Sequence, residues 1–394
     1  MKKNNLLTQV SFPGLFLIIL FFLLAAGCNK NQNILNKQEV SAKQLDGLGW
    51  GYGLDKQALT SFSQINLVAN NGDYGATLID PTLINGWGIA FSATGTPWVS
   101  SQGGHVSDVY NSEGTATVLG PVNIPSPGGP TGGNPTGVIF NPVGTDFVIP
   151  SANAQPATGA RFIFVGVDGI VSGWNGTRGV NAFAQFNHVA TSAYTGLAIA
   201  ANGGNNFLYA ADFRAGKIAV WDKTWGPVSM LFQDPSLPAG YSPFNIQAIG
   251  NELYVAYTKV GPDGRSQAGK GAGIINIFNP DGSFVKRFAS GDQLNAPWGI
   301  AMAPASFFPQ DEKNDDHPNS AILIGNFGDG HINAYSTDGK FLGQLKSGKN
   351  PIVIEGLWAI TFPPATSTIN PGRLYFAAGP KGETDGLFGY LIKE

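Results

Sequence analysis

Six short stretches of this 394-residue chain repeat one pattern, and their spacing constrains the fold more than any other feature of the sequence. Each stretch places an aromatic residue or a threonine before a small residue, and an alternating apolar run follows. The six stretches are 85–91, 134–140, 194–199, 242–249, 296–302 and 356–362. Their aligned positions 88, 137, 196, 245, 299 and 359 are 49, 59, 49, 54 and 60 residues apart. A period of about fifty residues is typical of a propeller or another repeat array.

Each repeat also carries the signals of four antiparallel strands. Two further apolar runs follow the first, for example 207–211 and 217–221 in the third repeat. Asp-Gly pairs between apolar runs favour hairpin turns, because both turn residues can take positive φ. Such pairs at 168–169, 281–282 and 338–339 predict the end of a third strand, and they assign 170–172, 284–286 and 341–343 to fourth strands. The chain is therefore predicted to be an all-β, six-bladed β-propeller with four antiparallel strands in each blade.

The two ends of the repeat region predict how the ring closes. The last repeat stops at its third strand, Leu387–Ile392, whose free edge would invite association with other chains. The segment Phe62–Val68 precedes the first repeat and alternates as a strand does. We expect this segment to pair with the last strand and complete the sixth blade. The sequence thus divides into a targeting segment (1–27), a flexible tether rich in Asn, Gln, Lys and Gly (28–58) and one propeller domain (59–394).

The first residues have the layout of a secretory signal peptide. Met1–Lys3 is basic, residues 15–24 are apolar, and Ala25-Ala26-Gly27 precedes Cys28. This arrangement resembles a bacterial lipobox, which implies cleavage before Cys28 and lipidation of its thiol. It predicts a bacterial envelope protein anchored to a membrane by lipid, and Asn29 in place of Asp after the cysteine favours the outer membrane. Ordinary signal cleavage beside an incidental cysteine is the alternative.

Composition removes several classes of function. Lys+Arg 23 against Asp+Glu 26 leaves no basic excess, so nucleic acid is not an expected partner. One cysteine excludes a disulfide framework and a four-cysteine zinc site. Residues 264–271 nearly match a phosphate-binding loop, but Gly271 replaces the final Ser or Thr and the segment lies between two strands. No Gly-x-Ser-x-Gly elbow is present, and no catalytic residue is assigned.

Several motifs of the later repeats resemble a known repeat family. Residues 297–301, 322–326, 330–335 and 338–339 are similar to the NHL-type propeller repeat. Over about residues 60–394 the chain is more similar to a family of secreted bacterial six-bladed propellers of unknown activity. The resemblance implies the fold but no reaction, because propellers support unrelated functions.

The resemblance also implies where a binding site would lie. In NHL-like propellers the first strands line the channel, and the loops entering them share a face with the loops between second and third strands. The ligand-binding candidates at one channel mouth are then Trp87, Tyr194, Phe244, Trp298, Trp358, Asp212, Asn326 and Asp329. Asn85, Gln102, Arg214 and Lys381 would lie on the same face. A concave mouth with aromatic walls is a common ligand site. Alternatively, the aromatic residues fill core volume at a repeated position.

Two hypotheses for function follow. The first is a non-catalytic binding propeller that needs no cofactor and takes a glycan, peptide or protein. The second is a divalent-cation-dependent lactonase or lyase, because such propellers hold a cation such as Ca²⁺ with Glu, Asn and Asp at the channel mouth. The residues available for that cation are Glu355, Asn245, Asn326 and Asp212. Service in ordinary turns is the alternative role for these four side chains. An enzyme is the less favoured of the two readings.

Overall fold

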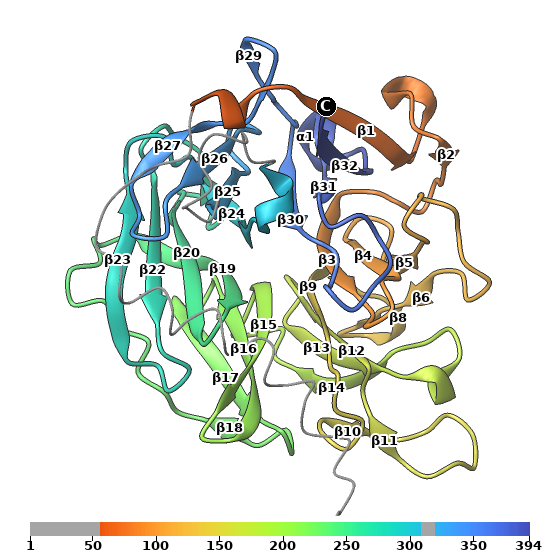
Figure 1. Cartoon of the computed structure of the whole chain (residues 1–394). Coiled ribbons are helices and arrows are strands. Elements are labelled where there is room, and N and C mark those ends of the chain that lie inside the picture. The colour runs from red at the N-terminus through yellow and green to blue at the C-terminus, as the bar shows by residue number, and fades with distance from the viewer. Residues whose placement is uncertain (1–55, 309–319) are drawn as a thin grey trace, which may run out of the picture. The chain divides into compact units, whose positions relative to one another are not determined.

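Six small antiparallel sheets stand around a central axis in the computed structural model, which describes residues 56–308 and 320–394 (Figure 1). This arrangement is the expected six-bladed β-propeller. The expected signal peptide and Cys28 lie outside the described residues, as does most of the expected tether. Helices in the described chain are short: η1 (Lys56–Leu59), η2 (Gly72–Tyr74), η3 (Gly176–Arg178), η4 (Ala305–Phe307) and α1 (Pro380–Glu383).

The six blades follow one another in chain order, each beginning at the axis. Blade 1 comprises β3 (Gly86–Phe91), β4 (Pro97–Ser101), β5 (Val106–Val109) and β6 (Val122–Asn123). Blade 2 comprises β9 (Pro135–Phe140), β12 (Phe162–Gly166), β13 (Ile170–Trp174) and β14 (Phe183–Asn187). Blade 3 comprises β15 (Tyr194–Asn202), β16 (Asn205–Asp212), β17 (Lys217–Asp222) and β18 (Pro227–Val228).

The second half of the ring follows the same plan. Blade 4 comprises β19 (Tyr241–Ile249), β20 (Glu252–Val260), β22 (Gly273–Phe278) and β23 (Phe284–Ser290), with β21 (Ser266–Gln267) added to β20. Blade 5 comprises β24 (Pro297–Met302), β25 (Ile322–Asn326), β26 (Ile332–Tyr335) and β27 (Phe341–Gln344). Blade 6 comprises β30 (Leu357–Thr361), β31 (Leu374–Ala378), β32 (Leu387–Lys393), β1 (Phe62–Ala69) and β2 (Leu78–Ile79). Small ribbons pair β7 (Pro125–Ser126) with β8 (Gly129–Gly132), β10 (Val148–Ile149) with β11 (Thr158–Gly159), and β28 (Lys346–Ser347) with β29 (Asn350–Pro351).

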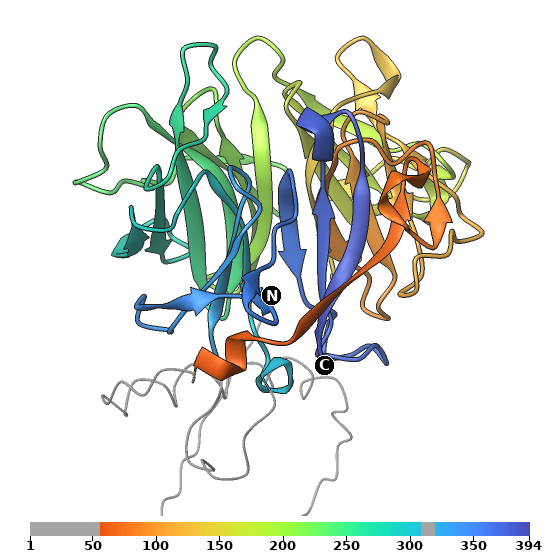
Figure 2. The same cartoon turned by 90° about the horizontal axis from the view of Figure 1, so that it is seen from above.

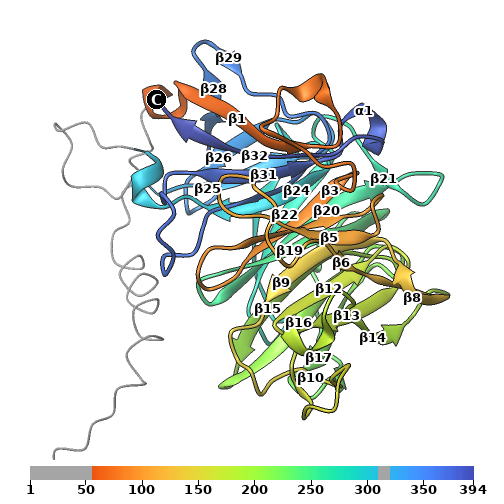
Figure 3. The ribbon, with the colours of Figure 1, turned by 90° about the vertical axis from the view of Figure 1, so that its right-hand side faces the viewer.

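The ring closes as the sequence predicts. β1 runs antiparallel to β32, with Phe62 opposite Lys393 and Ala69 opposite Leu387. Figure 3 shows the two strands side by side although they come from opposite ends of the described chain. The N-terminal strand therefore covers the edge that the last repeat leaves open, and β2 covers β1 in turn.

The small residue of the repeat allows neighbouring first strands to approach closely around the axis. A Cβ on Gly88 would lie 2.4 Å from the Thr136 oxygen of the next blade. A Cβ on Gly196 would lie 2.1 Å from Oδ1 of Asn245. Real Cβ atoms do not approach other atoms so closely, so the repeat requires glycine at these positions.

One strand assignment from the sequence is wrong. The run beginning at Ile170 forms β13, which is the third strand of blade 2 and not the fourth. The Asp168–Gly169 turn joins second and third strands, because a turn signature fixes a hairpin but not its place in the blade. The Asp281–Gly282 pair does precede a fourth strand, with Gly282 at φ 87° and Asp281 outside the left-handed region. Its hairpin therefore uses glycine at one position only, as in longer bulged loops.

Candidate functional site

The repeated aromatic position gathers side chains at the axis. The residues at this position, from blade 1 to blade 6, are Trp87, Thr136, Thr195, Phe244, Trp298 and Trp358. Trp87 stacks on Trp358 with ring centroids 3.5 Å apart. Trp298 meets Trp358 edge-on at 6.1 Å, and Phe244 lies 5.7 Å from it. We call the six side chains Trp87, Phe213, Phe244, Trp298, Phe327 and Trp358 the aromatic cluster.

The tryptophans of the aromatic cluster are buried. The exposed fraction of Trp358 is 1% and that of Trp87 and of Trp298 is 5%. Trp298 Nε1 donates to the Thr195 carbonyl at 2.9 Å, so this side chain crosses from blade 5 to blade 3. Trp358 Nε1 donates to Oδ1 of Asn85 at 2.8 Å. These aromatic side chains are therefore part of the hydrophobic core, as the alternative interpretation of the sequence proposed. Some of them also line a cavity.

A cavity of about 570 Å³ lies over the part of the channel where blade 3 supplies threonine. Its lining includes Trp87, Phe213, Phe244 and Trp358 from the aromatic cluster, together with Thr195, Ser242 and Gln102. Loop residues Arg214, Asp263 and Arg265 form its rim, where they are exposed. We call this space the mouth cavity. Its volume lies within the range of small-molecule sites.

One indole group in the lining is unsatisfied. Nε1 of Trp87 is buried and has no hydrogen-bond partner in the part of the chain that the structure describes. The other two axial tryptophans donate to Thr195 and Asn85. A buried donor without an acceptor costs about 1–3 kcal/mol and is rare in native proteins. Trp87 thus lines the mouth cavity and carries a covered donor that no described protein group satisfies.

A polar network connects the aromatic cluster to a carboxylate. Asn85 is fully buried and has φ 51°, a left-handed conformation that Asn adopts more readily than most residues. Its Nδ2 donates to Oε1 of Gln102 and to Oε2 of Glu383, both at 3.0 Å. Because Asn85 also accepts from Trp358, one amide group fixes both the ring and the carboxylate.

Glu383 is the partly buried acid of the mouth cavity. Its side chain is 25% exposed, and Arg265 Nη2 lies 3.8 Å from its Oε2. Burial raises the pKa of Glu383 above its ordinary value, while Arg265 and the Asn85 hydrogen bond act in the opposite direction. Lys381, Gly382 and Glu383 all have positive φ, at 52°, 63° and 72°. Two of these are not glycine, and such strain persists only where surrounding contacts hold it.

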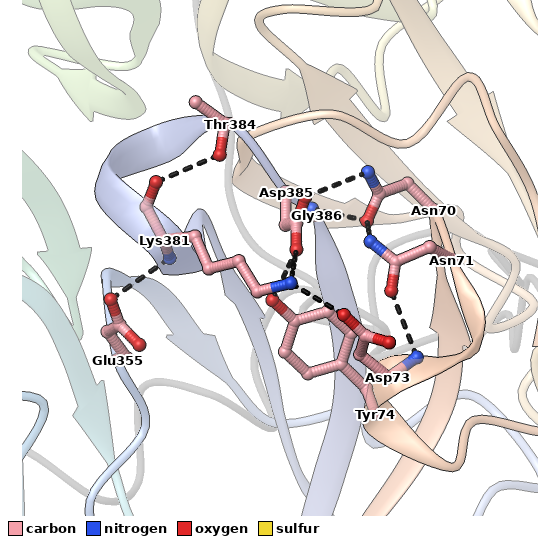
Figure 4. A network of polar contacts seen from close by, with 9 residues as sticks. All are labelled: Asn70, Asn71, Asp73, Tyr74, Glu355, Lys381, Thr384, Asp385 and Gly386. Atoms are coloured by element: carbon pink, nitrogen blue, oxygen red, sulfur yellow. Dashed lines mark hydrogen bonds and ion pairs between the residues drawn. The ribbon is translucent and has the colours of Figure 1, made fainter.

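The loop that carries Glu383 is held by side chains from three places: the segment after β1, the loop before β30 and the loop itself (Figure 4). Lys381 Nζ lies 2.6 Å from Oδ2 of Asp73 and 3.1 Å from Oδ2 of Asp385. The Tyr74 hydroxyl donates to the same Asp385 oxygen at 2.6 Å, and this hydrogen bond is the main cause that lowers the pKa of Asp385. Glu355 Oε1 accepts from the Lys381 backbone N–H at 3.0 Å. We call residues 380–386 the closing turn. The closing turn begins with α1, which Figure 2 shows on the opposite rim of the propeller from the C-terminus.

The structure separates the predicted ligand-binding residues into two groups. Trp87, Phe244 and Trp358 line the mouth cavity, and Trp298 packs against them without lining it. Tyr194 lies away from the mouth cavity, where it packs on Trp221 and its hydroxyl meets Nδ1 of His188 at 2.8 Å.

The polar candidates hold loops by hydrogen bonds, and those of Asp212 reach two residues that line the mouth cavity. Asp212 Oδ1 accepts from the backbone of Ala193 and Ala215, both at 3.1 Å. Asn326 Nδ2 donates to Oδ1 of Asp329 at 3.0 Å. None of these three acids and amides is among the residues that line the mouth cavity.

Each residue of the predicted cation set makes at least one hydrogen bond to the protein, but Oδ2 of Asp212 is buried and has no partner among the described residues. Asn245 Nδ2 donates to the Trp298 carbonyl and Asn326 Nδ2 to the Gln293 carbonyl, both at 2.7 Å. Asp212 and Glu355 accept from backbone N–H groups, as described above. Within residues 56–308 and 320–394, no three His, Cys, Asp or Glu side chains gather as metal ligands. Calcium binding stays a prediction.

Sequence reasoning did not select Glu383 or Arg265. It did select Lys381, and Glu383 belongs to the same loop between the second and third strands of blade 6. This position in the loop was the one feature of the sequence that could have identified Glu383. Arg265 lies in the segment that nearly matches a phosphate-binding loop, and nothing local shows that it reaches blade 6.

Two relatives are similar over most of the chain. The uncharacterised protein L690 of Acanthamoeba polyphaga mimivirus is 32% identical, over 84% of this chain and 86% of that protein. The uncharacterised protein R648 of the same virus is 31% identical, over 86% of this chain and 82% of that protein. The chain belongs to the family of these mimivirus proteins. No protein-family model matches it.

The family corrects the expected location. The similar curated proteins are proteins of a giant virus, so a bacterial cell envelope is the wrong setting for this chain. The error has a physical origin, because a basic start, a short apolar run and a cysteine form a short pattern of low specificity. No helix in the described part of the chain is both long and apolar enough to cross a bilayer.

Solved structures resemble this member of the mimivirus family at low identity. A streptogramin B lyase structure is 13% identical with a TM-score of 0.47, covering 84% of this chain and 97% of that one. A protein of unknown function from Bacteroides thetaiotaomicron is 12% identical with a TM-score of 0.49, covering 84% and 76%. Likenesses at this level carry no argument about activity.

Proposed function

We propose that the protein binds a small organic molecule in the mouth cavity. The observation that carries this proposal is the buried, unpartnered Nε1 of Trp87 in the lining of a cavity of about 570 Å³. A ligand with an acceptor would satisfy this donor without displacing an existing hydrogen bond, once a small movement of the lining uncovers the nitrogen. The sequence left glycan, peptide and protein ligands open, and a cavity of this size favours a small molecule.

The surroundings of Trp87 support a binding role. The rings of Trp358 and Phe244 are held in the core, while Arg214 and Arg265 at the rim are exposed. Rigid walls lower the entropic cost of ordering the site when a ligand binds. Loops on a rigid scaffold are where binding residues are usually found.

The test blocks the cavity from its rim. Ala215 is exposed and lines the mouth cavity, so Ala215→Trp narrows the space with little disturbance of the core. We expect a screen of small metabolites by thermal shift to give compounds that stabilise the wild-type chain and fail to stabilise Ala215→Trp. Ala154→Trp, in an exposed loop elsewhere, should keep every response. If Ala215→Trp keeps all responses as well, the proposal is wrong.

A further inference from the structure

We propose that the molecule in the mouth cavity is an organic cation, namely an ammonium compound that also carries an oxygen acceptor. This inference rests on the proposed function and specifies its ligand. Three features of the lining support it: the carboxylate of Glu383, the aromatic surfaces beside it and the unpartnered Nε1 of Trp87.

The charges of the site favour a cation in its interior. Glu383 is the inner carboxylate, whereas Asp263, the other acid of the lining, is exposed at the rim. The guanidinium groups are also at the rim: the Arg265 side chain is 73% exposed, and Arg214 Nη1 donates to the Val189 carbonyl at 2.8 Å. The ion pair between Arg265 and Glu383 is long, at 3.8 Å, and Arg265 is exposed. Water can therefore solvate the guanidinium group when a ligand cation takes its place beside Glu383.

The aromatic surfaces favour the same charge. Trp358 is covered on its faces by Trp87 at 3.5 Å and by Phe327 at 4.0 Å. The other aromatic rings named in the lining are Trp87, Phe213 and Phe244, with exposed fractions of 5%, 6% and 2%. Aromatic rings attract a cation within about 6 Å, and a quaternary ammonium group is the ligand most often recognised in this way.

The carboxylate of Glu383 disfavours an anion or a neutral apolar molecule, and the donor of Trp87 favours an oxygen on the ligand. An anion in the interior would face the carboxylate of Glu383, which the Asn85 amide holds in place at 3.0 Å. A neutral apolar molecule would take water from that carboxylate and add no partner to Asn85 and Arg265, and such burial of a charge is unfavourable. An oxygen on the cation would accept from Nε1 of Trp87 and satisfy the donor.

Choline and its uncharged isostere 3,3-dimethylbutan-1-ol provide the test, because they differ only in the charged nitrogen. Isothermal titration with the full chain should show that choline binds at least tenfold more tightly than the alcohol. Glu383→Gln keeps the acceptor for Asn85 and loses the charge, so we expect choline affinity to fall at least tenfold. Glu113→Gln is the matched control, because this exposed carboxylate does not line the mouth cavity, and it should change affinity less than twofold.

The pH dependence has a defined direction. A cation binds the ionised carboxylate, so affinity should be lost as the pH falls through the pKa of Glu383, which burial raises. Choline itself does not titrate, and in Glu383→Gln the acidic loss should disappear. The polar groups that contact the Glu383 carboxylate are Asn85 and Arg265.

The outcomes separate this inference from the proposed function. If choline fails to bind, binds no better than the alcohol, or binds Glu383→Gln unchanged, the inference is wrong. If the screen then yields neutral or anionic compounds that Ala215→Trp loses, the binding function stands without a cationic ligand. If Ala215→Trp loses nothing, both proposals fail.

Discussion

One repeat position has two uses in the two halves of the ring. Blades 5, 6 and 1 place Trp298, Trp358 and Trp87 at the axis, and the indole rings pack against one another. Blades 2 and 3 place Thr136 and Thr195 at the same position. The aromatic half fills the channel, whereas the mouth cavity opens beside Thr195. The comparison indicates that side-chain volume at the axis helps to decide where this channel stays open, although Thr136 is fully buried and lies outside the lining.

The largest expected effect comes from truncating the aromatic half. Trp358→Ala removes the stacking on Trp87 and Phe327 and the hydrogen bond to Asn85, so the free energy of unfolding should fall by ~3–5 kcal/mol. Thr195→Ala removes one long hydrogen bond of 3.4 Å to the Ala211 carbonyl, and we expect a loss of about 1 kcal/mol. Urea unfolding of both variants measures the difference. Equal losses would contradict the division into two halves.

The second prediction concerns a feature that both halves share, the glycine at which neighbouring first strands approach closely. Gly196→Ala would place a methyl group 2.1 Å from Oδ1 of Asn245, so we expect the free energy of unfolding to fall by ~1–3 kcal/mol. Gly176→Ala is the control, because nothing lies within 4 Å of its Cβ position and its φ is not positive. Thermal unfolding of both variants provides the comparison. A neutral Gly196→Ala would show that close approach of the first strands does not require glycine.

The smallest expected effect concerns calcium. Asn245, Asn326, Asp212 and Glu355 are engaged with protein groups, so we expect the melting temperature in 1 mM Ca²⁺ to match that in EDTA within ~1 °C. Differential scanning calorimetry of the wild-type chain decides it. A clear rise with Ca²⁺ that EDTA reverses would restore the cation-dependent enzyme hypothesis.

The closure and the blade count were predictable because they depend on local patterns. Alternation marks Phe62–Val68 as a strand, and the repeat spacing leaves only the sixth blade to receive it. The assignment of Ile170 to a fourth strand failed because the turn signature carries no information on blade position. Glu383 and Arg265 could not be paired from the sequence, because their loops belong to blades 6 and 4 and meet only across the axis.

The sequence by itself determined the strand periodicity, the number of repeats and the segment that closes the ring, because each follows from neighbouring residues and a recurring spacing. Only the tertiary structure decided which aromatic residues face a cavity and which are covered. It also decided that the closing turn, held by Asp73 and Tyr74, brings Glu383 to that cavity. Those outcomes depend on the volumes and charges that several blades bring to one place, and a one-dimensional pattern does not contain them.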